Sequence, residues 1–361
     1  MKKTIENKEL FEYLEKMYIG PYSKFELKIK SIFPTKKLDK TKLDHITSLR
    51  LDSLSSVCGI EELNNLEDLT LTNIYNMPDL NKIHNLESLS LDLNKGNINI
   101  EEIISISKND NFKKIKIFGN DVMNITPDQI LQFGPNTLLS YDNVYSFTTE
   151  QFHSIQTRII ELKKLVTKDM SDFDKVSIMY KHMLTDSFEY DYDNKSSSTN
   201  GFLVNSTLYG PLVLKKGVCS GISAALEVTL KSIGLEANSC GGWLDDKPSS
   251  GNMHQWNQVK IDGQWYNLDL TNDYDKNPWR FFLKSDLDTE WSKLHCRNLE
   301  DTGELFYKCN STKYDNLFKY DIITRNLLTE QKNDLEQMKI DNNLDVLTDE
   351  DYKESEGYKK K

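Results

Sequence analysis

The chain has 361 residues, of which 28% are charged, and its formal net charge is −11 with a pI near 5.2. This length exceeds one ordinary hydrophobic core and predicts two compact domains with tails. An acidic surface repels a phosphate backbone, so we expect no nucleic-acid partner.

The ends of the chain and its cysteines bear on location. Met1–Glu9 carries basic residues with no apolar run behind them, and no window approaches 18 consecutive apolar residues, so neither a secretory signal nor a membrane span is expected. Five scattered cysteines without CxxC spacing argue against a disulfide framework or a metal site and for a reducing compartment. We expect a cytoplasmic protein, or one exported without an N-terminal signal peptide, that needs no metal and no cofactor.

The N-terminal part repeats at one constant interval, seen in the successive pairs Leu49/Leu51, Leu69/Leu71 and Leu89/Leu91. The pattern Leu-x-x-Leu-x-Leu is the strand-bearing part of a leucine-rich repeat, whose strands stack over one shared core. Weaker copies bring the expected number of strands to about six. These copies are Leu27-x-Ile29, Phe112-x-x-Ile115-x-Ile117 and Asn136-x-x-Leu139-x-Tyr141, the last two at longer intervals.

We therefore predict a leucine-rich-repeat solenoid over residues 27–146, with an N-terminal helical cap within residues 1–26. Stacked repeats expose an extended concave face that commonly binds proteins, which favours docking of a protein partner. The alternative is a structural extension that only supports the second domain. The repeat pattern names no ligand.

The composition changes near Phe147, because all five tryptophans follow residue 242 and the leucine period ends before residue 145. Helical patterns are expected from Thr148 and from Phe173. The polar segment 190–201 is either a mobile loop over an active site or a solvated connector. Residues 321–361 are expected to hold one more helix and an acidic, flexible tail.

Residues 219–233 predict a buried helix that ends at Gly234. Cys219 would then lie at the helix N-terminus, where free N–H groups and the helix dipole stabilise a thiolate. Taken alone, a single cysteine is more often a small buried hydrophobe.

Residues 254–261 and 264–270 predict two strands of a hairpin, joined by Asp262-Gly263 in a type I′ turn. In that register Trp256 faces Asp269, and His254 is the diagonal neighbour of Asp269 at a Cβ separation of roughly 7 Å. The carboxylate would fix the imidazole tautomer and leave the other nitrogen to the thiol. We therefore expect a Cys-His-Asp triad of Cys219, His254 and Asp269.

Three motifs, in this order, resemble the transglutaminase-like superfamily, a branch of the papain-like cysteine enzymes. They are Gly217-Val218-Cys219-Ser220-Gly221, His254-Gln255-Trp256-Asn257 and Asp269-Leu270-Thr271. The resemblance covers residues 170 to 290, where Phe281-Phe282-Leu283 matches a short apolar strand that follows the motifs. It implies an α+β catalytic domain over residues 147–320, with Cys219 as nucleophile, His254 as base and Asp269 as orienting acid.

The chain departs from this family at Gln255, where alanine is usual, and at Asn272, where tryptophan is frequent. Tyr209-Gly210 is similar to a pair found upstream of the cysteine in bacterial members. The resemblance thus implies Tyr209, and with it Trp256, as contacts of the substrate or oxyanion, although a packed aromatic is the commoner role of a residue such as Tyr209. The calcium sites of animal transglutaminases have no counterpart here.

The sequence as a whole predicts a cysteine-dependent acyl-transfer enzyme that acts on amide bonds of a protein or peptide. Proteolysis, glutamine deamidation and transamidation share the first half-reaction, so the motifs leave all three open. The alternative from another class is a non-catalytic interaction module built on the same two domains.

Overall fold

The computed structural model describes residues 28–29, 47–52, 60, 63–73, 77–93, 99–141, 145–185, 189–191, 198–199, 202–244, 253–275, 279–297 and 306–317. The chain divides into two compact units, Met1–Gln156 and Thr157–Lys361. The division falls inside helix α4 (Thr149–Lys163), somewhat beyond the sequence boundary at Phe147. The cap predicted within residues 1–26 and the helix and tail predicted for 321–361 lie outside the described residues.

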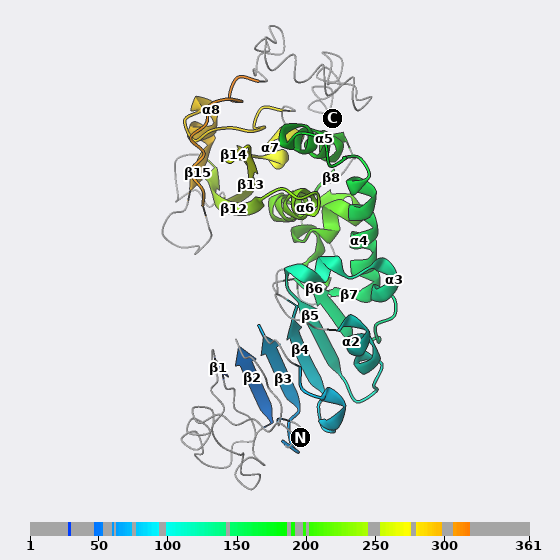
Figure 1. Ribbon diagram of the computed structural model, residues 1–361. Coiled ribbons are helices and arrows are strands. Elements are labelled where there is room, and N and C mark those ends of the chain that lie inside the picture. Colours follow the sequence, from blue (N-terminus) through cyan, green and yellow to red (C-terminus); the bar gives the residue numbers. More distant parts are fainter. Residues whose placement is uncertain are drawn as a thin grey trace. The chain divides into compact units, whose positions relative to one another are not determined.

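The first unit contains a seven-stranded sheet whose strands follow one another in chain order (Figure 1). Strands β1 to β6 pair in parallel, and β7 pairs antiparallel with β6. The strands are β1 (Lys28–Ile29), β2 (Ser48–Asp52), β3 (Asp68–Thr72), β4 (Ser88–Asp92), β5 (Lys114–Phe118), β6 (Thr137–Ser140) and β7 (Phe147–Thr148).

The pairing register follows the sequence repeats over most of this sheet. Leu49 pairs with Leu69, Leu69 with Leu89, and Leu89 with Ile115, which confirms the alignment of these repeats. Each of these side chains is 3% exposed or less. Because successive side chains point to opposite faces, the alternate residues of each strand lie on the other side of the sheet.

The register predicted for the last parallel strand was wrong. Ile117 pairs with Leu139, whereas the sequence repeats align it with Tyr141. This slip moves the strand by one full side-chain alternation and leaves Leu139 on the buried face, where it is 0% exposed. Apolar periodicity therefore cannot distinguish the two registers.

Short helices complete the turns of the first unit, and asparagine side chains connect successive turns. Asn136 Nδ2 donates to the carbonyl of Phe112 at 2.7 Å, and Asn85 Nδ2 donates to the carbonyl of Asn64 at 2.5 Å. The helices are η3 (Leu80–Lys82), α2 (Ile100–Ser107), η4 (Asn120–Asn124) and α3 (Pro127–Ile130).

The second unit combines helices with a four-stranded antiparallel sheet in the order β14-β13-β12-β15 (Figure 1). Its strands are β12 (Ala237–Leu244), β13 (Met253–Ile261), β14 (Gln264–Leu268) and β15 (His295–Arg297). Two small two-stranded sheets pair β8 (Glu189–Tyr190) with β11 (Lys216–Gly217) and β9 (Ser198–Thr199) with β10 (Phe202–Leu203).

The helices of this unit pack around its sheet, with α6 against β12 and β13 and beside α5 and α7. They are α5 (Asp172–Thr185), η5 (Val204–Ser206), η6 (Gly210–Leu214), α6 (Cys219–Ser232), α7 (Leu270–Asp275) and α8 (Thr289–Leu294). The helices expected from Thr148, Phe173 and Cys219 are thus present as α4, α5 and α6. Within the described part of the chain, no helix combines the length and apolar character that crossing a membrane requires.

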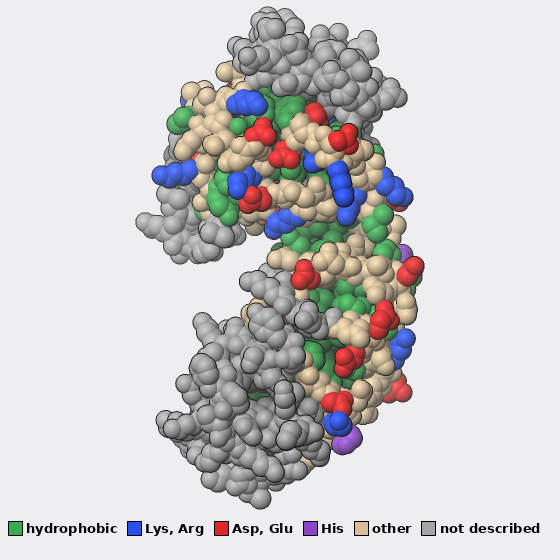
Figure 2. Space-filling model, viewed as in Figure 1, with side chains coloured by type: hydrophobic (Ala, Val, Ile, Leu, Met, Phe, Trp, Pro, Cys, Tyr) green, Lys and Arg blue, Asp and Glu red, His purple; other side chains and the backbone are tan. Residues whose placement is uncertain are grey.

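Acidic and basic side chains are interspersed on the face of the second unit that Figure 2 shows. Such mixing is typical of a solvated protein surface.

The apolar strand expected at residues 281–283 is absent, and the segment instead turns sharply. Trp279 and Leu283 have φ angles of 71° and 52°, and only Lys284 makes a bridge, to Asn267. The backbone groups of Phe281 are directed to the start of α7. Residues 281–283 therefore form a loop and not a strand, because the backbone of Phe281 bonds to Asp269 and Asp273 at α7.

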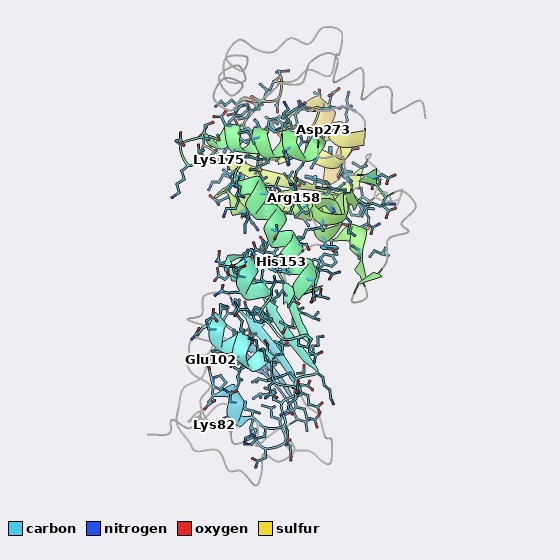
Figure 3. The ribbon with its side chains drawn as sticks, turned by 90° about the vertical axis from the view of Figure 1, so that its right-hand side faces the viewer. Lys82, Glu102, His153, Arg158, Lys175 and Asp273 are labelled. Carbon is cyan, nitrogen blue, oxygen red and sulfur yellow. The ribbon has the colours of Figure 1, made fainter. Side chains whose placement is uncertain are left out.

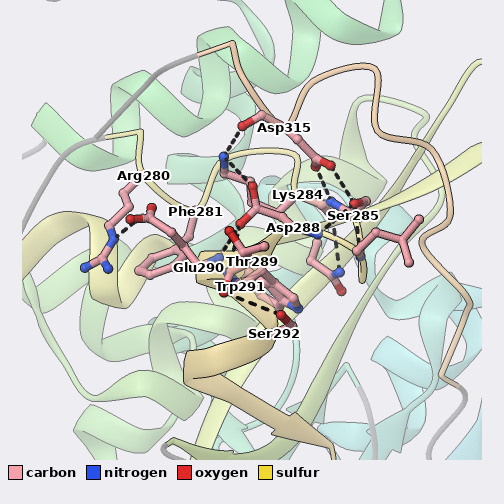
Figure 4. A network of polar contacts seen from close by, with 12 residues as sticks. Arg280, Phe281, Lys284, Ser285, Asp288, Thr289, Glu290, Trp291, Ser292 and Asp315 are labelled. Atoms are coloured by element: carbon pink, nitrogen blue, oxygen red, sulfur yellow. Dashed lines mark hydrogen bonds and ion pairs between the residues drawn. The ribbon is translucent and has the colours of Figure 1, made fainter. Parts of the chain in front are cut away.

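Residues 306–317 bind back across the loop and the hairpin. Ser285 donates from its backbone N–H and from Oγ to the carboxylate of Asp315, at 2.7 and 2.6 Å (Figure 4). Gln258, on β13, exchanges hydrogen bonds with the backbone of Tyr307. These contacts hold the segment that carries Phe281 against the sheet.

Candidate active site

Cys219 is the first residue of α6, as the sequence predicted. The preceding Val218 is extended and donates its N–H to the carbonyl of Asn205, which ties the start of the helix to η5. A Cβ at Gly221 would lie 2.3 Å from the carbonyl oxygen of Asn205. Glycine is therefore required in this motif for the close approach of α6 to η5, and the approach sets the position of the thiol.

Strand β13 brings His254 to this helix. Asn257 Nδ2 donates to the carbonyl of Ser223 in α6 at 2.9 Å, which ties the strand to the turn that follows Cys219. Since side chains alternate, Gln255 shares the face of Asn257, while His254 and Trp256 lie on the other. The His-Gln-Trp-Asn motif thus divides between the two faces of β13.

The hairpin has the expected turn, because Asp262 and Gly263 both have positive φ, 49° and 77°. The expected register is also present, with Ile261 opposite Gln264 and Gln258 opposite Asn267. Its length was predicted wrongly, however, since β14 ends at Leu268 and α7 starts at Leu270.

Asp269 therefore lies in the junction between β14 and α7, and not opposite Trp256 in a ladder. The expected hydrogen bond is nevertheless made: His254 Nε2 lies 2.8 Å from Asp269 Oδ2. The His254 and Asp269 side chains are 5% and 0% exposed. Because Nε2 is engaged by Asp269, Nδ1 is the ring nitrogen left for the interaction of His254 with the Cys219 thiol.

Asp269 is held by several donors besides His254. The backbone N–H of Asn272 donates to Oδ1 at 3.1 Å, and His295 Nε2 lies 2.7 Å from Oδ2. Asn272 Nδ2 also donates to Oδ2 and lies 3.3 Å from His254 Nε2. The Asn272 side chain, which stands where the family often has tryptophan, thus contacts both His254 and Asp269.

These contacts divide charge between the thiol and the imidazole. Burial raises the pKa of the Cys219 thiol, but the hydrogen bond and charge of His254, with the backbone N–H groups of Gln255 and Ser220, bring it below its usual value. Burial lowers the pKa of His254, but the charge of Asp269 and the hydrogen bonds with Asp269 and Cys219 raise it to about 10. Both shifts favour an ion pair of a thiolate and an imidazolium.

Asp269 carries the negative charge that supports this state. Burial raises the pKa of its carboxyl group, yet the charge and hydrogen bond of His254, together with His295, hold it well below its usual range. A second buried carboxyl group belongs to Asp273 on α7, which Figure 3 labels. It accepts from Tyr180 Oη at 2.5 Å and from the N–H of Phe281 at 2.8 Å. Burial raises the pKa of Asp273 well above its usual value.

His295 is the member of this cluster that the sequence did not indicate. It follows α8 directly, far beyond Asp269 in the chain, and no motif surrounds it. The one usable signal is the spacing of Trp291 and His295, which lie one helical turn apart. Their rings stack with centroids 3.7 Å apart.

The two further residues expected to contact substrate differ in exposure. Tyr209 is half-buried and precedes η6, and its role stays a prediction. Trp256 is 1% exposed and packs in a core cluster with Cys240, Phe281 and Trp291. A side chain so placed supports His254 from behind and has little surface to offer a substrate.

A metal could find three ligand atoms here, because the donor atoms of His254, Asp269 and His295 lie within 4.8 Å of one another. The Nε2 atoms of His254 and His295, however, both lie at hydrogen-bonding distance from the same oxygen, Asp269 Oδ2. A metal would have to replace both N–H protons and separate these atoms. The arrangement is that of a hydrogen-bonded cluster.

Comparison with known proteins supports the fold assignment of the second unit. Residues 162–270 match the sequence profile described as the Transglutaminase-like superfamily. A search of curated proteins gave no match.

The described part of the chain holds no disulfide. Its cysteines are free thiols, namely Cys219, Cys240, Cys296 and Cys309.

Solved structures that match part of this chain include a TGase, with 21% identity, a TM-score of 0.29, and coverage of 36% of this chain and 35% of that one. Another is the periplasmic domain of TgpA from Pseudomonas aeruginosa bound to ethylmercury, with 16% identity, a TM-score of 0.25 and coverage of 34% and 48%. This chain thus spans less than half the length of either relative. The profile match over residues 162–270 is what identifies a transglutaminase-like α/β domain in the second unit.

Proposed function

We propose that this protein is a cysteine-dependent acyl-transfer enzyme that acts on amide bonds of a protein or peptide through Cys219, His254 and Asp269. The observation that carries the proposal is a thiol at a helix N-terminus that interacts with a buried imidazole, which is in turn hydrogen-bonded to a fully buried carboxylate. Nucleophilic catalysis by a thiol needs this order of nucleophile, base and orienting group.

In the first half-reaction the Cys219 sulfur donates an electron pair to the amide carbonyl carbon, and the carbonyl π electrons move onto oxygen. Backbone N–H groups at the start of α6 stabilise this oxyanion. When the C–N bond breaks, the departing amine takes the Nδ1 proton of the His254 imidazolium. Asp269 holds the imidazole at Nε2 throughout, so that Nδ1 stays directed at the reacting atoms.

In the second half-reaction an acceptor attacks the thioester while His254 removes its proton. Cys219 leaves as a thiolate and the imidazolium is restored. Water as acceptor gives proteolysis or glutamine deamidation, and an amine gives transamidation. We favour an effector-like deamidase or protease, because the chain joins this site to a sheet suited to holding a protein.

For the first unit we propose a leucine-rich-repeat solenoid that recruits the protein partner. The regular parallel pairing and the asparagine bonds between turns support this interpretation. The face opposite the leucines presents Thr70, Ser90 and Lys116 in one row, all half-buried. A row of polar side chains is a suitable surface for hydrogen bonds to an extended partner.

Alkylation by iodoacetamide at mildly acidic pH tests the proposal without knowledge of the substrate. Cys219 should react much faster than Cys296, which is also a half-buried thiol, and His254→Ala should abolish that advantage. Equal reactivity of the two thiols would favour the non-catalytic alternative.

Trapping on Cys219→Ala then identifies the substrate, and the product mass distinguishes deamidation, cleavage and transamidation. Full activity of Cys219→Ala on the trapped substrate would refute the proposal.

A further inference from the structure

His295 shares the carboxylate oxygen that orients His254. Both Nε2 atoms lie at hydrogen-bonding distance from Asp269 Oδ2, 2.7 Å for His295 and 2.8 Å for His254. An ionised carboxylate only accepts hydrogen bonds, so both rings donate an N–H to it. We propose that His295 is a positioning residue of the active site, which fixes Asp269 and limits how much of its negative charge reaches His254. This inference rests on the proposed function.

The His295 ring is locked in place by the residues around it. One face stacks on Trp291 at an interplanar angle of 6°, and the edges of Trp256 and Phe281 close the sides, with centroids 5.2 and 5.1 Å away. Asp288 caps α8 by accepting from the backbone N–H groups of Glu290 and Trp291, both at 2.9 Å (Figure 4). A ring held on three sides presents Nε2 in one direction.

Glycine makes room for this arrangement. Gly242 on β12 lies opposite His254 on one side and Arg297 on the other. A Cβ at Gly242 would meet the carbonyl oxygen of Cys296 at 2.2 Å and the Trp256 ring at 2.7 Å. The close approach of β15 therefore depends on this glycine, and it brings the adjacent His295 into reach of Asp269.

The two histidines differ in charge although they share a partner. Burial lowers the pKa of His295 and the positive charge of His254 lowers it further, against the hydrogen bond with Asp269. The proton therefore belongs to His254, whose pKa is raised. The lowered pKa of His295 favours its neutral form, which donates from Nε2 to Asp269, while Nδ1 lies 3.3 Å from the carbonyl oxygen of Trp291.

The other titratable groups around this oxygen leave the division of charge intact. Cys219 interacts with His254, and the lowered pKa of its thiol favours the thiolate that balances the imidazolium charge. Asp273 and Tyr180 are hydrogen-bonded to each other, and burial raises the pKa of both, which favours their neutral forms. Lys284 is engaged by Asp288 and by the carbonyl of Asp315.

Removing the His295 donor concentrates the charge of Asp269 on His254. A more basic imidazole keeps its proton to higher pH but gives it less readily to the departing amine. The loss should appear in kcat and in kcat/KM together, with KM nearly unchanged, because the interaction acts on the reacting groups and not on substrate binding.

The test compares His295→Gln, whose amide nitrogen replaces Nε2 as donor, with His295→Leu, which has no donor. We expect His295→Leu to lower the acylation rate roughly 10- to 100-fold, the loss of one hydrogen bond to a charged group, and His295→Gln to restore most of it. In His295→Leu the alkaline step in the pH profile of Cys219 alkylation should move to higher pH. Thermal unfolding of both variants monitors folding.

Two results would overturn the inference. An unchanged rate and pH profile in His295→Leu would remove the positioning role alone, and so would equal losses in both variants with an unchanged profile. Because alkylation needs no substrate, it separates the two proposals. A wild-type Cys219 without an acid-stable thiolate would refute the proposed function and this inference with it.

Discussion

The stacked sheet of the first unit and the cluster around Asp269 in the second are both built from buried side chains, but they are organised differently. Leu49, Leu69 and Leu89 are chemically equivalent and each supports the next. Asp269 Oδ2 instead accepts bonds from His254 and His295, which come from different elements. A repeat spreads its stability over many similar contacts, whereas the site concentrates its chemistry on one oxygen.

The largest effect should follow a change at that oxygen. Asp269→Asn puts one amide N–H₂ among N–H donors and removes the charge that raises the pKa of His254. We expect kcat/KM on the trapped substrate to fall roughly a thousandfold to ten-thousandfold, as for a triad that loses its orienting carboxylate. Steady-state kinetics would measure this.

Asp273→Asn is the matched control, because Asp273 is equally buried and lies one helical turn further on. It accepts from Tyr180 and Phe281, and burial raises its pKa and so favours the neutral carboxyl group that an amide resembles. Activity should largely survive. An equal loss in the two variants would show that burial of polar groups, and not contact with His254, explains the effect.

In the first unit the corresponding change should cost stability and leave chemistry intact. Leu89→Ala opens a cavity at a fully buried position and should lower the free energy of unfolding by about 2–5 kcal/mol. Ser90→Ala, the next residue on the opposite face, should change it by less than about 0.5 kcal/mol.

Denaturant titration would measure both variants. Alkylation of folded Cys219 should be unaffected in each, since Leu89 belongs to the first compact unit and Cys219 to the second. A slower alkylation rate in folded Leu89→Ala would contradict the separation of roles.

The pH profile of Cys219 alkylation should show a lowered thiol pKa and a raised imidazole pKa. A thiol with a lowered pKa stays ionised as the pH falls below the usual range, so alkylation at mildly acidic pH should exceed that of His254→Ala by about tenfold or more. A second step is expected as the pH rises through about 10, where His254 loses its proton. A single step at the pH of an ordinary thiol would contradict the ion pair.

The smallest effect on stability is expected from an ion pair whose two side chains are exposed to solvent. Lys113 Nζ lies 2.7 Å from Glu87, the same distance as His295 from Asp269, but these side chains are 74% and 43% exposed. Lys113→Ala should therefore change the free energy of unfolding by less than about 0.5 kcal/mol. Thermal melts at low and high salt would measure it, and a large salt-dependent loss would contradict this view.

Several features of the site were predictable because they depend on local rules. The turn residues Asp262 and Gly263 set the hairpin register, and that register brings His254 near Asp269. Gly234, with a φ of 90°, closes the helix that begins at Cys219. Each of these signals lies close in the chain to the structure it specifies.

Other features depend on contacts between distant segments. The end of β14 at Leu268 follows from the competing hydrogen bonds that Asp269 and Asp273 make with Phe281. The two-residue shift that pairs Leu139 with Ile117 follows from the length of the turn between β5 and β6. The alternation of side chains along a strand is the same in both registers and cannot predict this length.

The sequence alone determined the parallel repeats of the first unit, the helix that starts at Cys219 and the pairing of His254 with Asp269, since periodicity, capping and turn chemistry act locally. Only the tertiary structure decided that His295 joins Asp269, that Trp256 is buried and that residues 281–283 form a loop. The physical reason is that these outcomes depend on which groups, distant in the chain, bind to the Asp269 carboxylate and to the backbone of Phe281. Local sequence patterns contain no information about such long-range contacts.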